Sequence, residues 1–93
     1  MSVVDLVREV VTSIPAGRVA TYGDIGKQIG AGPRQVGRAM SVLGDDVPWW
    51  RVVYADGKAA TCHDGGALAF LLAEGTPLVG DRIDLRRARV TFG

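Results

Sequence analysis

The sequence predicts a small, mainly helical α+β domain of the winged helix-turn-helix type with a short β-hairpin. Two stretches of helical periodicity are joined by a turn of about four residues that contains glycine, the usual helix-turn-helix arrangement. After Pro48 the hydrophobic pattern changes to a period of two, which indicates a hairpin. The length of 93 residues suits one domain, expected over residues 1–93.

The first helix is predicted over residues 3–13. Ser2, with Asp5 three residues later, resembles a capping box, which satisfies backbone N–H groups at a helix start. Pro15 and Gly17 then break the helix. Its apolar residues recur at helical spacing and predict a face toward the core: Val3, Val4, Leu6, Val7, Val10, Val11 and Ile14.

Two further helices follow. Thr21 and Asp24 repeat the capping pattern and predict a helix from Tyr22 to Ile29. The turn is "GAGP", residues 30–33, and proline suits the first position of the next helix, which we expect to reach about Leu43.

The third helix has two different faces. Arginine at both i and i+4, beside small residues, would let that face approach a nucleic acid and reach its phosphates or a groove. The alternative is an ordinary solvated face. The core side is predicted to hold Val36, Met40 and Leu43, and the outer side Arg34, Gly37, Arg38 and Ser41.

The second half of the chain alternates strand and helix signals. We predict a strand over 51–54, a turn at Asp56 and Gly57, and a return strand. Residues 64–66 form a loop, and "ALAFLLAEG" is a last helix closed by Gly75. The tail is expected to form an irregular strand or two, from its apolar residues Ile83, Leu85, Val90 and Phe92.

Composition limits the setting. The net charge is only +1, but no acid lies between Asp24 and Asp45, and nine of the 11 basic residues are arginine, which suits phosphate. No apolar run reaches the roughly 20 residues that span a bilayer. The N-terminus lacks the basic region of a secretion signal. Cys62 is the only cysteine, so we expect a reducing, cytoplasmic setting. We also expect a monomer, with no cofactor and no metal.

Four separated motifs resemble one family. "IPAGRVATYGDIG", "RQVGRAM", "PWWRVV" and "LLAEG" occur in the order found in the C-terminal DNA-binding domain of O6-alkylguanine-DNA alkyltransferases. The chain is more similar still to the alkyltransferase-like proteins, which are small single-domain relatives. In the transferases the motif Pro-Cys-His-Arg carries the acceptor cysteine and the histidine that activates it. Alkyltransferase-like proteins have tryptophan at the cysteine position.

The corresponding residues here are Pro48, Trp49, Trp50 and Arg51. Trp49 stands at the nucleophile position, and indole, which is only a hydrogen-bond donor, cannot accept an alkyl group. The resemblance implies instead that Trp49 is an aromatic wall for a flipped base; the alternative is that it packs. Trp50, at the histidine position, departs even from the alkyltransferase-like pattern. It could narrow the pocket or turn outward against Glu74 or the hairpin.

Other family residues carry over by position. The resemblance implies that Tyr22 helps turn out the target nucleotide and that Arg34 enters the base stack in its place. Gly37, Arg38 and Ala39 would lie along the recognition helix, in the minor groove. Arg51 is structural in the family.

Glu74 and residues 62–66 complete the expected site. Glu74 matches an acid that orients the missing histidine, which leaves it to partner a nearby cation. The segment with Cys62, His63 and Asp64 resembles the loop that lines the alkylguanine pocket. Cys62 and His63 could also be nucleophile and base, or two metal ligands, although adjacent side chains on an extended segment point apart.

The resemblance implies a non-enzymatic protein that recognises O6-alkylguanine in duplex DNA by nucleotide flipping. It would flag the lesion for nucleotide excision repair proteins. The alternatives are a winged-helix transcription regulator that reads undamaged DNA by sequence, and an alkyltransferase that uses Cys62.

Overall fold

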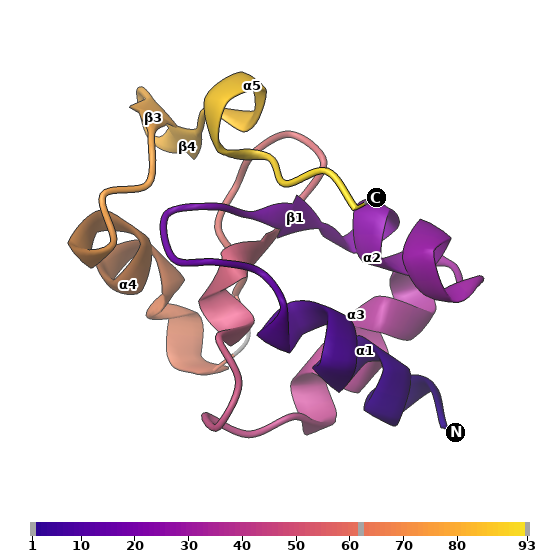
Figure 1. Cartoon of the computed structure of the whole chain (residues 1–93). Coiled ribbons are helices and arrows are strands. Elements are labelled where there is room, and N and C mark those ends of the chain that lie inside the picture. The colour runs from indigo at the N-terminus through magenta and orange to yellow at the C-terminus, as the bar shows by residue number, and fades with distance from the viewer. Residues whose placement is uncertain (1, 62, 93) are drawn as a thin grey trace.

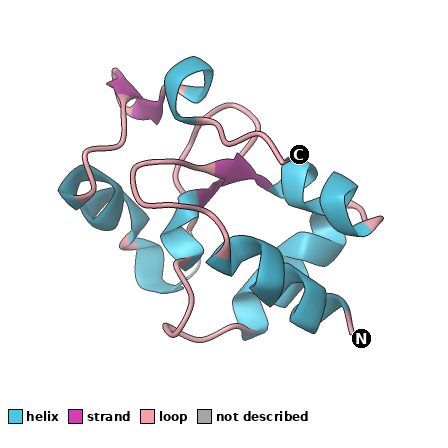
Figure 2. Cartoon of the chain, viewed as in Figure 1, coloured by secondary structure: helices cyan, strands magenta, loops and turns pink. Residues whose placement is uncertain are grey.

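The computed structural model describes residues 2–61 and 63–92 (Figure 1). The predictions made for Cys62 therefore lie outside the described residues, as does the side chain of Asp64. Helices and short strands occur in the expected proportion (Figure 2), which confirms the α+β, mainly helical fold class. No helix in the described ranges is long and apolar enough to cross a membrane.

Three helices form the N-terminal half, and their predicted bounds are confirmed to within a residue. They are α1 (Val3–Thr12), α2 (Tyr22–Ile29) and α3 (Pro33–Val42), and each packs against the other two. Both capping boxes are present. The Ser2 hydroxyl accepts from the Asp5 N–H at 3.2 Å, and the Thr21 hydroxyl accepts from the Asp24 N–H at 3.0 Å.

The turn between α2 and α3 depends on two glycines. Gly30 ends α2 at φ 75°, the left-handed region that glycine adopts without strain. Gly26 lies beneath the turn, where a Cβ would be 2.4 Å from the Ala31 carbonyl oxygen. The turn can therefore close tightly over α2, which fixes the direction in which α3 leaves.

The hairpin predicted after residue 51 is confirmed in a shortened form: its turn is present, and the Gly57 N–H donates to the Tyr54 carbonyl at 2.9 Å. A 3-10 helix occupies Trp49–Arg51, and the strand β2 is only Val52–Val53, which pairs in parallel with β1 (Ala20–Thr21). Within the described ranges the return segment pairs with β2 through one antiparallel bridge, Val53 to Ala59. The Gly57 carbonyl of the turn accepts from the Ile83 N–H at 2.8 Å.

A second antiparallel hairpin lies in the tail. Strand β3 (Leu78–Val79) pairs with β4 (Arg82–Ile83), and a short helix, α5 (Leu85–Ala88), follows where only irregular strand was expected. The chain then runs back beside β1 (Figure 1), where the Val90 N–H donates to the Val19 carbonyl at 2.8 Å. The tail is thus part of the folded body.

The core has two parts. The larger one lies among the three N-terminal helices and contains the predicted Val36, Met40 and Leu43. The smaller one lies between β2, α4 (Ala67–Ala73) and the tail. Its buried members are Val19, Val53, Leu71, Ile83 and Ala88.

Candidate nucleic-acid interface

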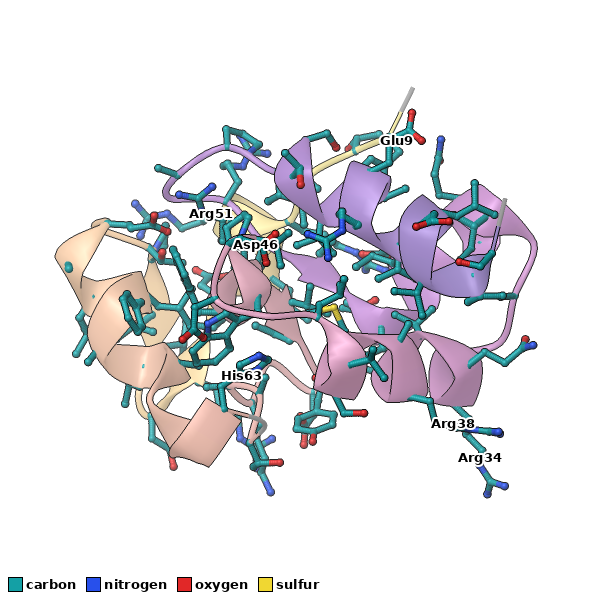
Figure 3. The ribbon with its side chains drawn as sticks, turned by 90° about the horizontal axis from the view of Figure 1, so that it is seen from below. Glu9, Arg34, Arg38, Asp46, Arg51 and His63 are labelled. Atoms are coloured by element: carbon teal, nitrogen blue, oxygen red, sulfur yellow. The ribbon has the colours of Figure 1, made fainter. Side chains whose placement is uncertain are left out.

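The outer face of α3 is basic and open. Arg34 and Arg38 are exposed, leave the same side of the helix and point away from the rest of the protein (Figure 3). Within the described ranges, neither forms an ion pair. Gly37 lies between them, with no atom within 4 Å of the place where a Cβ would be. A flat anionic surface can therefore approach this helix closely between two mobile cations.

A cavity of about 460 Å³ opens beside this face. One wall is α3, and the other is formed by Tyr22 and the segment after β2. The Tyr22 and Tyr54 rings are 5.2 Å apart between centroids and tilted by 33°. The residues that line the cavity are Tyr22, Pro33, Arg34, Gly37, Tyr54 and Thr61.

The structure thus brings three of the predicted residues, Tyr22, Arg34 and Gly37, to one cavity. Ala39, in contrast, is only 3% exposed and belongs to the core, so its side chain packs inside the protein rather than facing DNA. Sequence reasoning did not select Tyr54 or Thr61. The sequence offered only a weak signal for Tyr54, an aromatic residue directly after an apolar strand, and none for Thr61.

Trp49 does not line this cavity. It is 3% exposed, and its ring is stacked on His63 with centroids 4.4 Å apart and planes 15° from parallel. Phe70 meets it edge-on at 5.8 Å. The expectation of an open indole wall for a base is therefore wrong for this conformation. The 3-10 turn after Pro48 directs Trp49 inward and Trp50 toward α4.

His63 closes over Trp49 from the following loop. Its backbone has φ 55°, and its Nε2 lies 2.8 Å from the Leu43 carbonyl oxygen. A carbonyl oxygen can only accept, so Nε2 is the donor in this contact. Nδ1 is buried and has no partner among the described atoms. The predicted loop residue His63 thus contacts Trp49 and is not among the residues that line the cavity beside α3.

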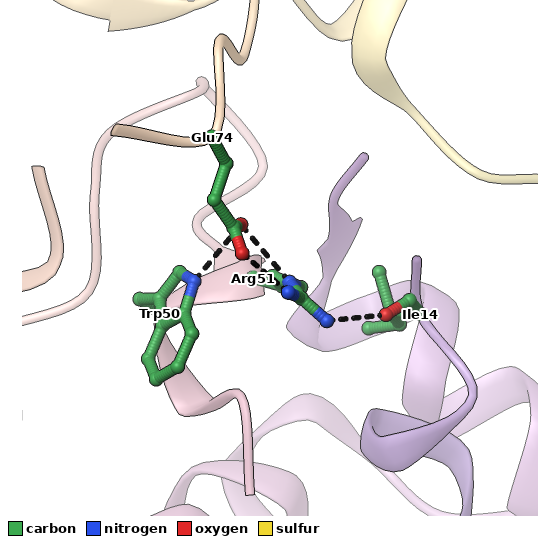
Figure 4. A network of polar contacts seen from close by, with 4 residues as sticks. All are labelled: Ile14, Trp50, Arg51 and Glu74. Carbon is green, nitrogen blue, oxygen red and sulfur yellow. Dashed lines mark hydrogen bonds and ion pairs between the residues drawn. The ribbon is translucent and has the colours of Figure 1, made fainter. Parts of the chain in front are cut away.

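Trp50 takes the outward alternative and contacts Glu74 (Figure 4). Its Nε1 donates to Glu74 Oε1 at 3.0 Å, and its ring stacks on Phe70 at 4.4 Å. Arg51 donates from Nε to the same oxygen at 3.0 Å, forms an ion pair with the other, and donates from Nη1 to the Ile14 carbonyl at 2.8 Å.

This network lowers the pKa of the Glu74 carboxyl. The Arg51 guanidinium, assisted by the Trp50 N–H, holds the pKa of the Glu74 carboxyl below its usual value, against the opposing effect of burial. Glu74 therefore stays ionised and partners a cation, as expected without the histidine.

Part of the Arg-rich tail also has structural partners. Arg89 donates to Asp24 at 2.9 Å and lowers the pKa of that carboxyl, which also caps α2. Arg82 pairs with Asp56 at 3.7 Å. Across the described residues, no three side chains of the His, Cys, Asp or Glu types gather as a metal site would require.

A family model described as "6-O-methylguanine DNA methyltransferase, DNA binding domain" matches residues 3–74. The chain belongs to this family. Among its relatives, the Escherichia coli "DNA base-flipping protein" is 40% identical over 91 residues, which is 90% of this chain and 70% of that protein. The Schizosaccharomyces pombe "Alkyltransferase-like protein 1" is 44% identical over 55 residues, which is 55% of this chain and 51% of that protein.

Solved structures of this family have the same fold. Schizosaccharomyces pombe Atl1, in complex with damaged DNA that contains O6-carboxymethylguanine, superimposes with a TM-score of 0.83 at 27% identity, over 96% of this chain and 94% of Atl1. The Mycobacterium tuberculosis O6-methylguanine methyltransferase gives 0.70 at 33% identity, over 87% of this chain and 53% of the enzyme. The alkyltransferase-like resemblance is confirmed.

We predict that Glu74→Gln lowers the free energy of unfolding by about 1.5–3 kcal/mol near pH 7, the usual range for hydrogen bonds to charged groups. The pKa of Glu74 is lowered by folding, so its stabilisation is complete above the ordinary value of 4.5 and is lost as pH falls through the folded value. The difference between wild type and variant in urea unfolding should therefore shrink below about pH 4.5.

Asp46→Asn is the matched control, because the Arg8–Asp46 pair is exposed, at 43% and 65%. An exposed pair contributes about 0–1 kcal/mol. Equal losses in the two variants, or a Glu74→Gln effect that persists at pH 3, would contradict the assignment.

Proposed function

We propose that this protein binds duplex DNA through α3 and recognises O6-alkylguanine by turning the damaged nucleotide out of the helix. The observation that carries this proposal is the juxtaposition of the open Arg34–Gly37–Arg38 face with the adjoining cavity of about 460 Å³. This volume lies in the range of small-molecule sites, roughly 300–1,000 Å³. The relatives named for base flipping, and Atl1 with damaged DNA, support the same reading.

Arg34, Arg38 and Tyr22 each have a distinct role in this mechanism. Arg34, at the cavity rim, enters the base stack and fills the gap that the flipped nucleotide leaves. Arg38, one turn further on, holds phosphate. Tyr22 stands at the start of α2 and supports the rotated nucleotide. Extrusion costs a few kcal/mol and less for a damaged base, so the lesion itself lowers the cost of recognition.

We propose that the protein performs no alkyl transfer. Transfer needs a thiolate and a group that lowers its pKa. The two motif positions hold indoles instead, one stacked under His63 and one bonded to Glu74. The relatives named as base-flipping and alkyltransferase-like proteins support this reading.

We expect the wild-type protein to bind a duplex with one O6-methylguanine more tightly than the matched undamaged duplex, with no change in protein mass. Fluorescence anisotropy gives the two affinities, and intact-protein mass spectrometry follows the titration. Equal affinities would favour the sequence-reading regulator. A gain of one methyl group, lost in Cys62→Ala, would establish the transferase.

Arg34→Ala should weaken lesion-duplex binding by about tenfold or more while leaving thermal unfolding unchanged, because the side chain is exposed and unpaired within the described ranges. Arg87→Ala removes the same charge from α5 and is the control. If Arg34 contacted only a phosphate, its loss would weaken binding to the damaged and undamaged duplexes equally. An equal loss on both would therefore exclude insertion of Arg34 into the stack.

We further propose that the bound complex marks the lesion for nucleotide excision repair, since a protein that cannot remove the alkyl group leaves the damage for another pathway. Expression of the protein should raise survival after treatment with an alkylating agent only in cells whose excision repair is intact. Equal protection in excision-deficient cells would contradict this role.

A further inference from the structure

We propose that Tyr54 is the aromatic wall that stacks against the flipped base, in the place that the family pattern gives to the residue at position 49. This inference rests on the proposed function and names a residue that binds the flipped base. It follows from three observations. The Trp49 ring is already covered by other side chains, the Tyr54 ring is exposed to the cavity, and the Tyr54 ring is held in position by hydrogen bonds.

The indole of Trp49 is already covered. His63 stacks on it nearly in parallel at 4.4 Å, and Phe70 and Trp50 meet it edge-on at 5.8 Å. With 3% of the residue exposed, a base could reach the ring only after His63 had left. That displacement would break the contact between His63 Nε2 and the Leu43 carbonyl. The stacking position on Trp49 is therefore taken within the protein itself.

Tyr54, in contrast, is 39% exposed and lines the cavity beside α3. It shares this cavity with Arg34 and with Tyr22, whose ring lies 5.2 Å away. A nucleotide that leaves the DNA at Arg34 thus meets two aromatic rings before it could reach Trp49. Stacking on an aromatic face tolerates any base, so an alkyl group on guanine does not prevent it.

The Tyr54 ring is also held in position before any ligand arrives. Its backbone N–H donates to the Lys58 carbonyl at 3.0 Å, and its carbonyl accepts from the Gly57 N–H at 2.9 Å. Its hydroxyl lies 3.2 Å from the Thr61 hydroxyl, which fixes the far end of the ring. A ring held at both ends loses little freedom on binding, so more of the stacking energy appears as affinity.

The test compares three duplexes that differ at one position: O6-methylguanine, guanine, and an abasic tetrahydrofuran residue. Tyr54→Ala should bind the O6-methylguanine duplex about tenfold or more weakly than wild type, and the abasic duplex equally well, because the abasic residue has no base to stack. Tyr54→Phe keeps the ring and should retain most of the affinity. Val42→Ala, on α3 but outside the cavity and 70% exposed, is the matched control.

Thermal unfolding confirms that each variant is folded, and Tyr54→Leu, which keeps bulk without an aromatic face, serves if the alanine variant does not fold. If Tyr54→Ala binds the O6-methylguanine duplex as tightly as wild type, or loses affinity equally for the damaged and abasic duplexes, the role of Tyr54 is overturned and the proposed function is not. Tighter lesion binding by His63→Ala, with no effect of Tyr54→Ala, would assign the wall to Trp49 and also overturn it. A wild-type protein that does not distinguish the damaged duplex would overturn the proposed function as well.

Discussion

Arg51 joins three segments of the chain through one guanidinium group. It bonds the carbonyl of Ile14 at the end of the first helix, and both oxygens of Glu74 at the end of α4. Both charged side chains are 16% exposed, so they are shielded from most of the solvent, and neither could remain there alone at low cost. The contact therefore ties the Trp49–Arg51 turn, which leads directly into β2, to both α1 and α4.

The pair of tryptophans shows how this constraint is used. Trp49 fills the core beneath the loop, while Trp50 supplies the second hydrogen bond to Glu74 and covers Phe70. An indole N–H thus occupies the position of the histidine that the family's acid would orient. In this chain the motif bridges α4 to the strand through Arg51 and Trp50, and its two central positions hold indoles.

Much of the first half could be predicted from the sequence because its signals are local. The caps at Ser2 and Thr21 and the glycine at position 30 act within a few residues, and the predicted helices were confirmed. The second half depends on partners distant in sequence. β2 pairs with β1 as well as with the segment that follows it, and α5 has only four residues, too few to show periodicity.

The candidate site follows the same division. Tyr22 and Arg34 could be selected because each lies in a motif that resembles the family, and the structure brings them to one cavity. The burial of Trp49 could not be predicted, since it depends on the position of His63 across the loop. Tyr54 was missed because its proximity to Tyr22 arises only when β2 lies beside β1.

The homologous region and the folding unit have different boundaries. The family match ends at residue 74, yet the turn that orients Tyr54 bonds to Ile83, and the cap of α2 bonds to Arg89. At Gly57, with φ 88° and the Ile83 oxygen 2.6 Å from where a Cβ would be, the fit leaves no room for a side chain. A chain shortened to the shared region would keep Tyr22, Arg34 and Tyr54 and lose both of these contacts, so residues 75–92 brace the region that the family shares.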